Sequence, residues 1–138
     1  MLFFVSLPAT VEARSGSAVW GGLVFATNQP GQTSGRYDTH PYARRFRKIF
    51  GYRYYELLGK DRQPIRSQGV NQLQLGREFH AKLRFLGAKR NGLAFALELY
   101  RNDRKVVESN VILGRDSPLV IRGPQWGKGQ LLFLLMVR

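Results

Sequence analysis

Alternation of apolar and polar residues with a period of two runs through the second half of this 138-residue chain. Between Arg77 and Phe85 every second residue is apolar, and Leu93 to Leu99 repeats the pattern. The pair Asn91-Gly92 between them is the one that tight β-hairpins favour. Successive side chains of a strand point to opposite faces of a sheet, so these residues predict two half-buried strands joined by a hairpin.

Further segments are rich in apolar, aromatic and β-branched residues, as strands are. They are Ala18–Thr27, Tyr52–Leu58, Val70–Leu75, Val106–Leu113, Leu119–Ile121 and the apolar run Leu131–Val137. Several strands joined by short turns predict a mainly β fold, either an antiparallel β-sandwich or an open barrel. A chain of this length predicts a single domain, here over residues 14–138.

One short amphipathic helix is predicted before most of the strands. Pro41 suits the first helical position, and Gly51 stands where a helix ends. One face of this helix is apolar and carries Tyr42, Phe46, Ile49 and Phe50. The other face is basic and carries Arg44, Arg45, Arg47 and Lys48, with Arg53 just beyond the helix. This positive cluster predicts either a contact with phosphates or anionic lipid, or simply the solvated side of the helix.

Basic charge is in large excess, with 22 Lys and Arg against 9 Asp and Glu and a net charge of +13. Such a domain attracts polyanions such as nucleic acid, anionic lipid or anionic envelope polymers. The alternative is that the charge serves solubility alone. The chain has no Cys, which excludes disulfides and zinc–thiolate sites.

No catalytic apparatus is recognisable. His40 and His80 are the two histidines; one precedes a helix-start proline and the other shares a polar strand face with Lys82 and Arg84. Neither context predicts a metal ligand or a general base. The carboxylates are scattered, and no nucleophile or phosphate-binding motif is present. The sequence therefore predicts a protein that is not an enzyme and needs no cofactor or metal, unless a site assembles only in three dimensions.

A second candidate site lies in the glycine-rich connection Gly123–Gly129. Trp126 there can be a stacking platform for a base or sugar, with Arg122 and Lys128 beside it for anions. The alternative is that Trp126 folds back over the edge of the core.

The N-terminus predicts export. Leu2–Leu7 is almost entirely apolar, and Val11-x-Ala13 fits a signal-peptidase site, although no basic residue precedes Arg14. Residues 1–13 are therefore interpreted as a truncated signal segment, which would place the protein in the bacterial periplasm or outside the cell. The alternative is a first strand stopped by Pro8, in a cytoplasmic protein. The run Leu131–Val137 is too short to span a membrane.

Two motifs resemble a group of uncharacterised exported bacterial β-sandwich proteins. They are the segment Phe50-Gly51-Tyr52 to Leu58 and the closing segment Gly123-Pro124-Gln125-Trp126-Gly127-Lys128-Gly129-Gln130-Leu131. The resemblance implies an envelope β-sandwich and carries no catalytic residues. Together with the charge, it predicts a non-enzymatic binding or assembly domain of the bacterial envelope, contacting a protein or an anionic polymer. The alternative is a nucleic-acid-binding β-barrel that uses the basic helix and exposed aromatics. The oligomeric state is open.

Overall fold

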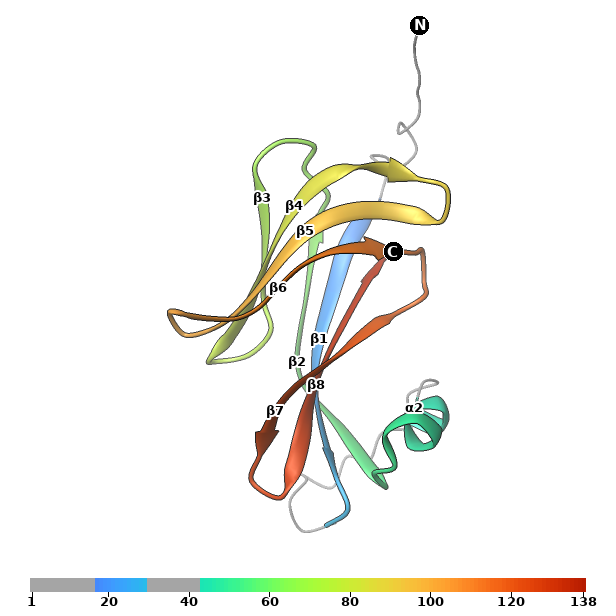
Figure 1. Ribbon diagram of the computed structural model, residues 1–138, viewed down its shortest axis with the longest axis vertical. Helices are drawn as coiled ribbons and strands as arrows, with labels where there is room; N and C mark the ends of the chain where they lie inside the picture. Colours follow the sequence, from blue (N-terminus) through green and yellow to red (C-terminus); the bar gives the residue numbers. More distant parts are fainter. Residues whose placement is uncertain (1–16, 30–42) are drawn as a thin grey trace, which may run out of the picture.

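The computed structural model describes residues 17–29 and 43–138. They form two four-stranded antiparallel sheets and one short helix (Figure 1), which confirms the predicted mainly β, sandwich-like fold. The elements are β1 (Ala18–Thr27), α2 (Ala43–Phe50), β2 (Tyr54–Pro64), β3 (Val70–Gln74), β4 (Phe79–Lys89), β5 (Gly92–Arg101), β6 (Arg104–Leu113), β7 (Leu119–Trp126) and β8 (Gly129–Val137). Residues 1–13, the predicted signal segment, lie outside the described residues.

Sheet A has the strand order β2-β1-β8-β7, and sheet B has the order β3-β4-β5-β6. Sheet B is a meander, since its strands follow one another along the chain. Sheet A instead pairs the first strand with the last, and the backbones of Ala18 and Arg138 exchange two hydrogen bonds of 2.8 Å. The pairing of β1 with β8 therefore brings together residues from both ends of the described chain.

Strands β1 and β8 are buried on both faces along their whole length. One face belongs to the main core between the sheets, around Leu23, Phe95 and Phe133. The other belongs to a second apolar cluster on the outside of sheet A, which includes Trp20 and Phe46. Burial on both faces explains why Leu131–Val137 is a continuous apolar run rather than an alternating one.

The two sheets are joined at the corner between β2 and β3. The backbone N–H of Gln74 donates to Asp61 Oδ2 at 2.9 Å, and Asn71 Nδ2 donates to the Pro64 carbonyl at 2.8 Å. Gly59 permits this close approach, because a Cβ atom there would overlap the Leu75 carbonyl. These contacts satisfy part of the hydrogen-bonding capacity of two edge strands.

Strand β7 extends five residues beyond the predicted segment Leu119–Ile121 and ends at Trp126. The sequence pattern predicted a glycine-rich connection over Gly123–Gly129, which includes Pro124. As an edge strand, β7 tolerates a proline, and its register shifts between Arg122 and Gln125. The buried side chain of Gln130 supports this irregular stretch by donating to the carbonyls of Gly123 and Pro124.

Tyr55 supplies a testable property of the second core cluster. Its side chain is buried, and among the described residues its hydroxyl forms no hydrogen bond of normal geometry. Burial raises the pKa of this phenol and outweighs the opposing effects of the Tyr52 backbone N–H and the Arg47 charge.

Tyr55→Phe is expected to raise the free energy of unfolding by about 1 kcal/mol, because it removes a buried polar group without a partner. The pKa of Tyr55 in the folded state lies above the unfolded value near 10.0. Ionisation of Tyr55 thus costs more free energy in the folded state than in the unfolded state, so it lowers stability only as the pH rises from that value through the folded pKa. The Tyr55→Phe variant should lack this part of the loss of stability at alkaline pH. Urea unfolding at neutral and alkaline pH measures both effects, and a less stable variant would contradict this account.

Candidate binding surfaces

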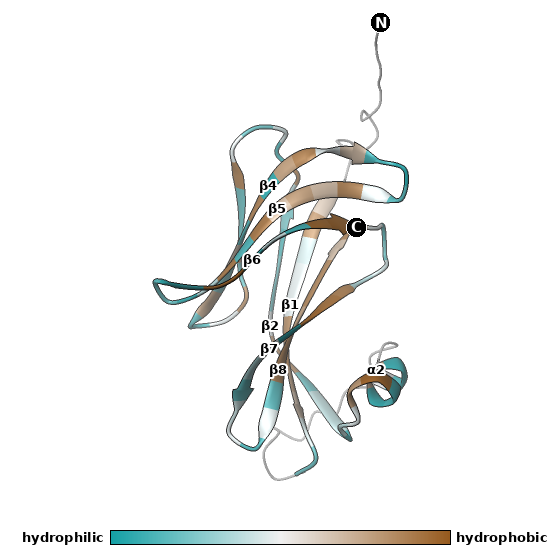
Figure 2. Cartoon of the chain, in the orientation of Figure 1, coloured by the Kyte–Doolittle hydropathy of each residue, from teal (hydrophilic) through white to brown (hydrophobic). Residues whose placement is uncertain are grey.

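Helix α2 lies against the outer face of sheet A and is anchored by Phe46 (Figure 1). The Phe46 side chain is 2% exposed, and its ring centroid lies 5.7 Å from Tyr55 and 6.1 Å from Phe50. The helix thus turns an apolar side to the sheet and a polar side outward, as its colouring shows (Figure 2). The anchoring fixes the position of the basic residues that flank Phe46.

The apolar face of α2 differs from the prediction at Ile49, which is 59% exposed. Phe46 and Phe50 pack against the sheet, so they define the side of the helix that faces it. Each residue turns a helix by about 100°, so Ile49 lies roughly 80° from the midpoint of those two residues, at the margin of the contact. Tyr42, the other predicted member of this face, lies outside the described residues.

The predicted basic cluster is exposed on α2 and just after it. Its members are Arg44, Arg45, Arg47, Lys48 and Arg53. Arg47 Nε donates to the Arg53 carbonyl at 3.1 Å, and the Arg53 N–H donates to Asn28 Oδ1 at 2.9 Å. These bonds connect the end of the helix to Asn28, which follows β1. The backbone that carries these cations is therefore fixed relative to sheet A.

Arg122 of β7 joins this cluster. Its guanidinium lies 5.3 Å from the centroid of the Phe50 ring, at the C-terminal end of α2. We call the six residues Arg44, Arg45, Arg47, Lys48, Arg53 and Arg122 the α2 surface. Among the residues that the structure describes, no carboxylate forms an ion pair with Arg44, Arg47, Lys48, Arg53 or Arg122. Their charge is therefore not neutralised within that part of the chain.

The predicted site of Arg122, Trp126 and Lys128 is not assembled. Trp126 packs on the inner side of sheet A, with its ring 5.9 Å from Phe79 and the Arg101 guanidinium 4.7 Å from its centroid. Arg122 belongs to the outer side, beside α2, and Lys128 is exposed in the turn between β7 and β8. The register shift within β7 places the side chains of Arg122 and Trp126 on opposite faces of sheet A. Trp126 thus folds back over the core edge, the second of the two interpretations.

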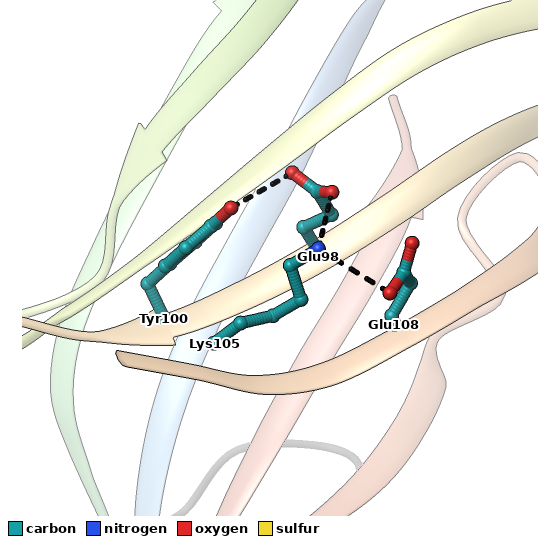
Figure 3. Close-up of polar contacts among 4 residues, drawn as sticks. All are labelled: Glu98, Tyr100, Lys105 and Glu108. Carbon is teal, nitrogen blue, oxygen red and sulfur yellow. Dashed lines mark hydrogen bonds and ion pairs between the residues drawn. The ribbon is translucent and has the colours of Figure 1, made fainter. Parts of the chain in front are cut away.

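A polar network on the outer face of sheet B was not anticipated (Figure 3). Tyr100 donates to Glu98 Oε1 at 3.0 Å, and Lys105 Nζ contacts Glu98 at 2.9 Å and Glu108 at 3.3 Å. The bonds from Lys105 and Tyr100 hold the pKa of Glu98 below its usual value. His80, one of the two histidines considered as metal ligands, stacks on Tyr100 with ring centroids 5.0 Å apart. The register at the turn between β4 and β5 would place Leu99 opposite Lys82, and the shift between Phe85 and Gly87 places Glu98 there instead. Sequence alone therefore gave no signal for this network.

The structure also bears on metal and membrane binding. Within residues 17–29 and 43–138, no group of three or more His, Asp or Glu side chains could hold a metal ion. In the same part of the chain, no helix is long and apolar enough to cross a membrane. His40 lies outside the described residues.

Comparison of the chain with protein-family models, with curated protein sequences and with solved structures found no match.

Proposed function

We propose that this domain is a non-enzymatic binding domain that recognises an anionic polymer through the α2 surface. One observation carries the proposal: cations gather on one side of sheet A, and five of them form no ion pair with a carboxylate among the described residues. These five are Arg44, Arg47, Lys48, Arg53 and Arg122. A cluster of cations held on a packed helix attracts a polyanion, because each contact releases condensed counterions.

The arrangement of the aromatic side chains favours recognition of charge over recognition of bases. A stacking platform needs a free ring face. Trp126 packs on Phe79 and lies beneath Arg101, and Tyr100 is stacked on His80. These contacts occupy part of both rings, so we propose recognition of charge, in which any nucleic acid would be bound through its phosphates.

An envelope location is part of the proposal. It rests on Leu2–Leu7 and the Val11-x-Ala13 pattern, and on the resemblance of the sequence to exported β-sandwich proteins. An exported domain would meet anionic polysaccharides and other charged envelope polymers rather than nucleic acid.

Binding to dextran sulfate and to neutral dextran tests this function. We expect the domain to bind dextran sulfate with an affinity that falls steeply as salt rises, and to leave neutral dextran unbound. Fluorescence anisotropy with labelled polymers measures both. Equal binding to the two polymers, or binding that is indifferent to salt, would refute recognition by charge.

A further inference from the structure

The outer face of sheet B carries an ordered array of side chains from neighbouring strands. The register aligns Arg84 with Ala96 and Ala96 with Asn110 across β4, β5 and β6. The next row aligns Lys82, Glu98 and Glu108. Neighbouring strands lie about 4.8 Å apart, so these six side chains surround a small area in the middle of the sheet.

A hollow of about 210 Å³ lies within this array. Its lining includes both cations, Lys82 and Arg84, the two carboxylates, and Asn110. Ala96 is part of this lining and lies between Arg84 and Asn110 in the register, so a longer side chain there would extend between these two residues. Ligand pockets commonly measure roughly 300–1,000 Å³, so this hollow is of a size for one small ring.

Positive and negative side chains line different sides of the hollow. Glu98 is already engaged by Tyr100 and Lys105, as Figure 3 shows. Lys105 also contacts Glu108. Among the described residues, Lys82 and Arg84 form no ion pair with a carboxylate, although Lys82 Nζ lies 5.0 Å from the centroid of the Tyr100 ring. The β4 side of the hollow therefore offers two cations, and the β6 side offers a carboxylate and an amide.

We propose that this hollow binds a sugar acid, a single ring that carries one carboxylate and several hydroxyls. The ligand carboxylate would meet Arg84 and Lys82, because a guanidinium fork matches a carboxylate. The hydroxyls would donate to Glu108 and exchange hydrogen bonds with Asn110, since a carboxylate side chain only accepts. This site lies on the opposite layer from the α2 surface, so it goes beyond the proposed function and is tested separately.

Other small anions fit the lining less well. A dicarboxylate would place its second charge against Glu108. A nucleotide would require a free aromatic face, and His80 and Lys82 already contact the Tyr100 ring. An amino acid would direct its ammonium group to Glu108, and glycine serves as the probe for that ligand class.

Calorimetric titration with glucuronate, glucose and glycine tests the site. Glucuronate should bind at least about tenfold more tightly than glucose, because glucose lacks the charged group that Arg84 and Lys82 recognise. Arg84→Gln should weaken glucuronate binding by about tenfold or more. Ala96→Ile should abolish it by filling the hollow, with the fold retained because isoleucine suits a strand. Titration with methyl glucuronide distinguishes two sources of the ligand. If methyl glucuronide binds, the hollow accepts a sugar acid linked within a polymer. If only free glucuronate binds, the ligand is a free sugar acid.

Arg90→Gln is the matched control, because it removes one exposed cation in the turn between β4 and β5. It should leave glucuronate binding unchanged, as should a variant with the basic residues of α2 replaced. Equal affinities for glucuronate and glucose, tighter binding of glycine, or an unchanged affinity in both Ala96→Ile and Arg84→Gln would each overturn the proposal. Dextran sulfate binding of Ala96→Ile reports on the α2 surface alone, so the two sites fail independently.

Discussion

A variant with Gln at the four basic positions of α2 is expected to lose much of the salt dependence of its binding to duplex DNA, used here as a calibrated polyanion. The four positions are Arg44, Arg45, Arg47 and Lys48. Each phosphate contact contributes about 0.9 to the slope of log affinity against log salt, so the slope should flatten by roughly 3 to 4 if each residue makes one contact. Anisotropy titrations over a range of salt concentrations measure the slope.

The fold should survive this change. These side chains are exposed, and Arg47 donates one hydrogen bond to the Arg53 carbonyl. Losing that bond costs about 1 kcal/mol. The matched control replaces four exposed cations elsewhere, namely Arg66, Lys89, Arg90 and Arg104. If the control flattens the slope as much as the α2 variant does, net charge rather than the α2 surface governs binding.

Phe46→Ala is expected to destabilise the domain by about 3–5 kcal/mol, because it removes a fully buried ring and leaves a cavity between α2 and sheet A. Phe46 is 2% exposed and contacts the rings of Tyr55 and Phe50. Affinity for dextran sulfate should fall as well, because the helix that presents the cations is no longer fixed on the sheet. Denaturant unfolding measures the first effect and anisotropy the second.

Ile49→Ala provides the comparison from the same helix. At 59% exposure this side chain contributes little to the packing, so the change in stability should stay within about 0.5 kcal/mol. Polymer binding should remain as in the parent, because no cation is moved. Similar losses for both variants would mean that Ile49 is packed, as the sequence pattern alone had indicated.

Local patterns determined the fold class and most of the strands. The alternation over residues 77–85 and 93–99 identifies β4 and β5, because the period of two is a property of the single strand. The Asn-Gly pair identifies their turn for the same reason, since a hairpin turn depends on a few adjacent residues. The basic side of α2 was also predicted from the sequence, because helical spacing alone separates Arg44 and Lys48 from Phe46.

Tertiary packing decided the features that depend on two or more elements. Ile49 lies outside the contact because the orientation of α2 follows from Phe46 and Phe50 together. Arg122 joins the helix while Trp126 packs on the other face, because a register shift in β7 turns the strand between them. The hollow around Ala96 exists because three strands align in one register, and the bulges between Phe85 and Gly87 and between Leu99 and Tyr100 shift that register from the one that the two hairpin turns alone would give. Periodicity fixes which way a side chain points from its own strand, but only the assembled sheets decide which other side chains it meets there.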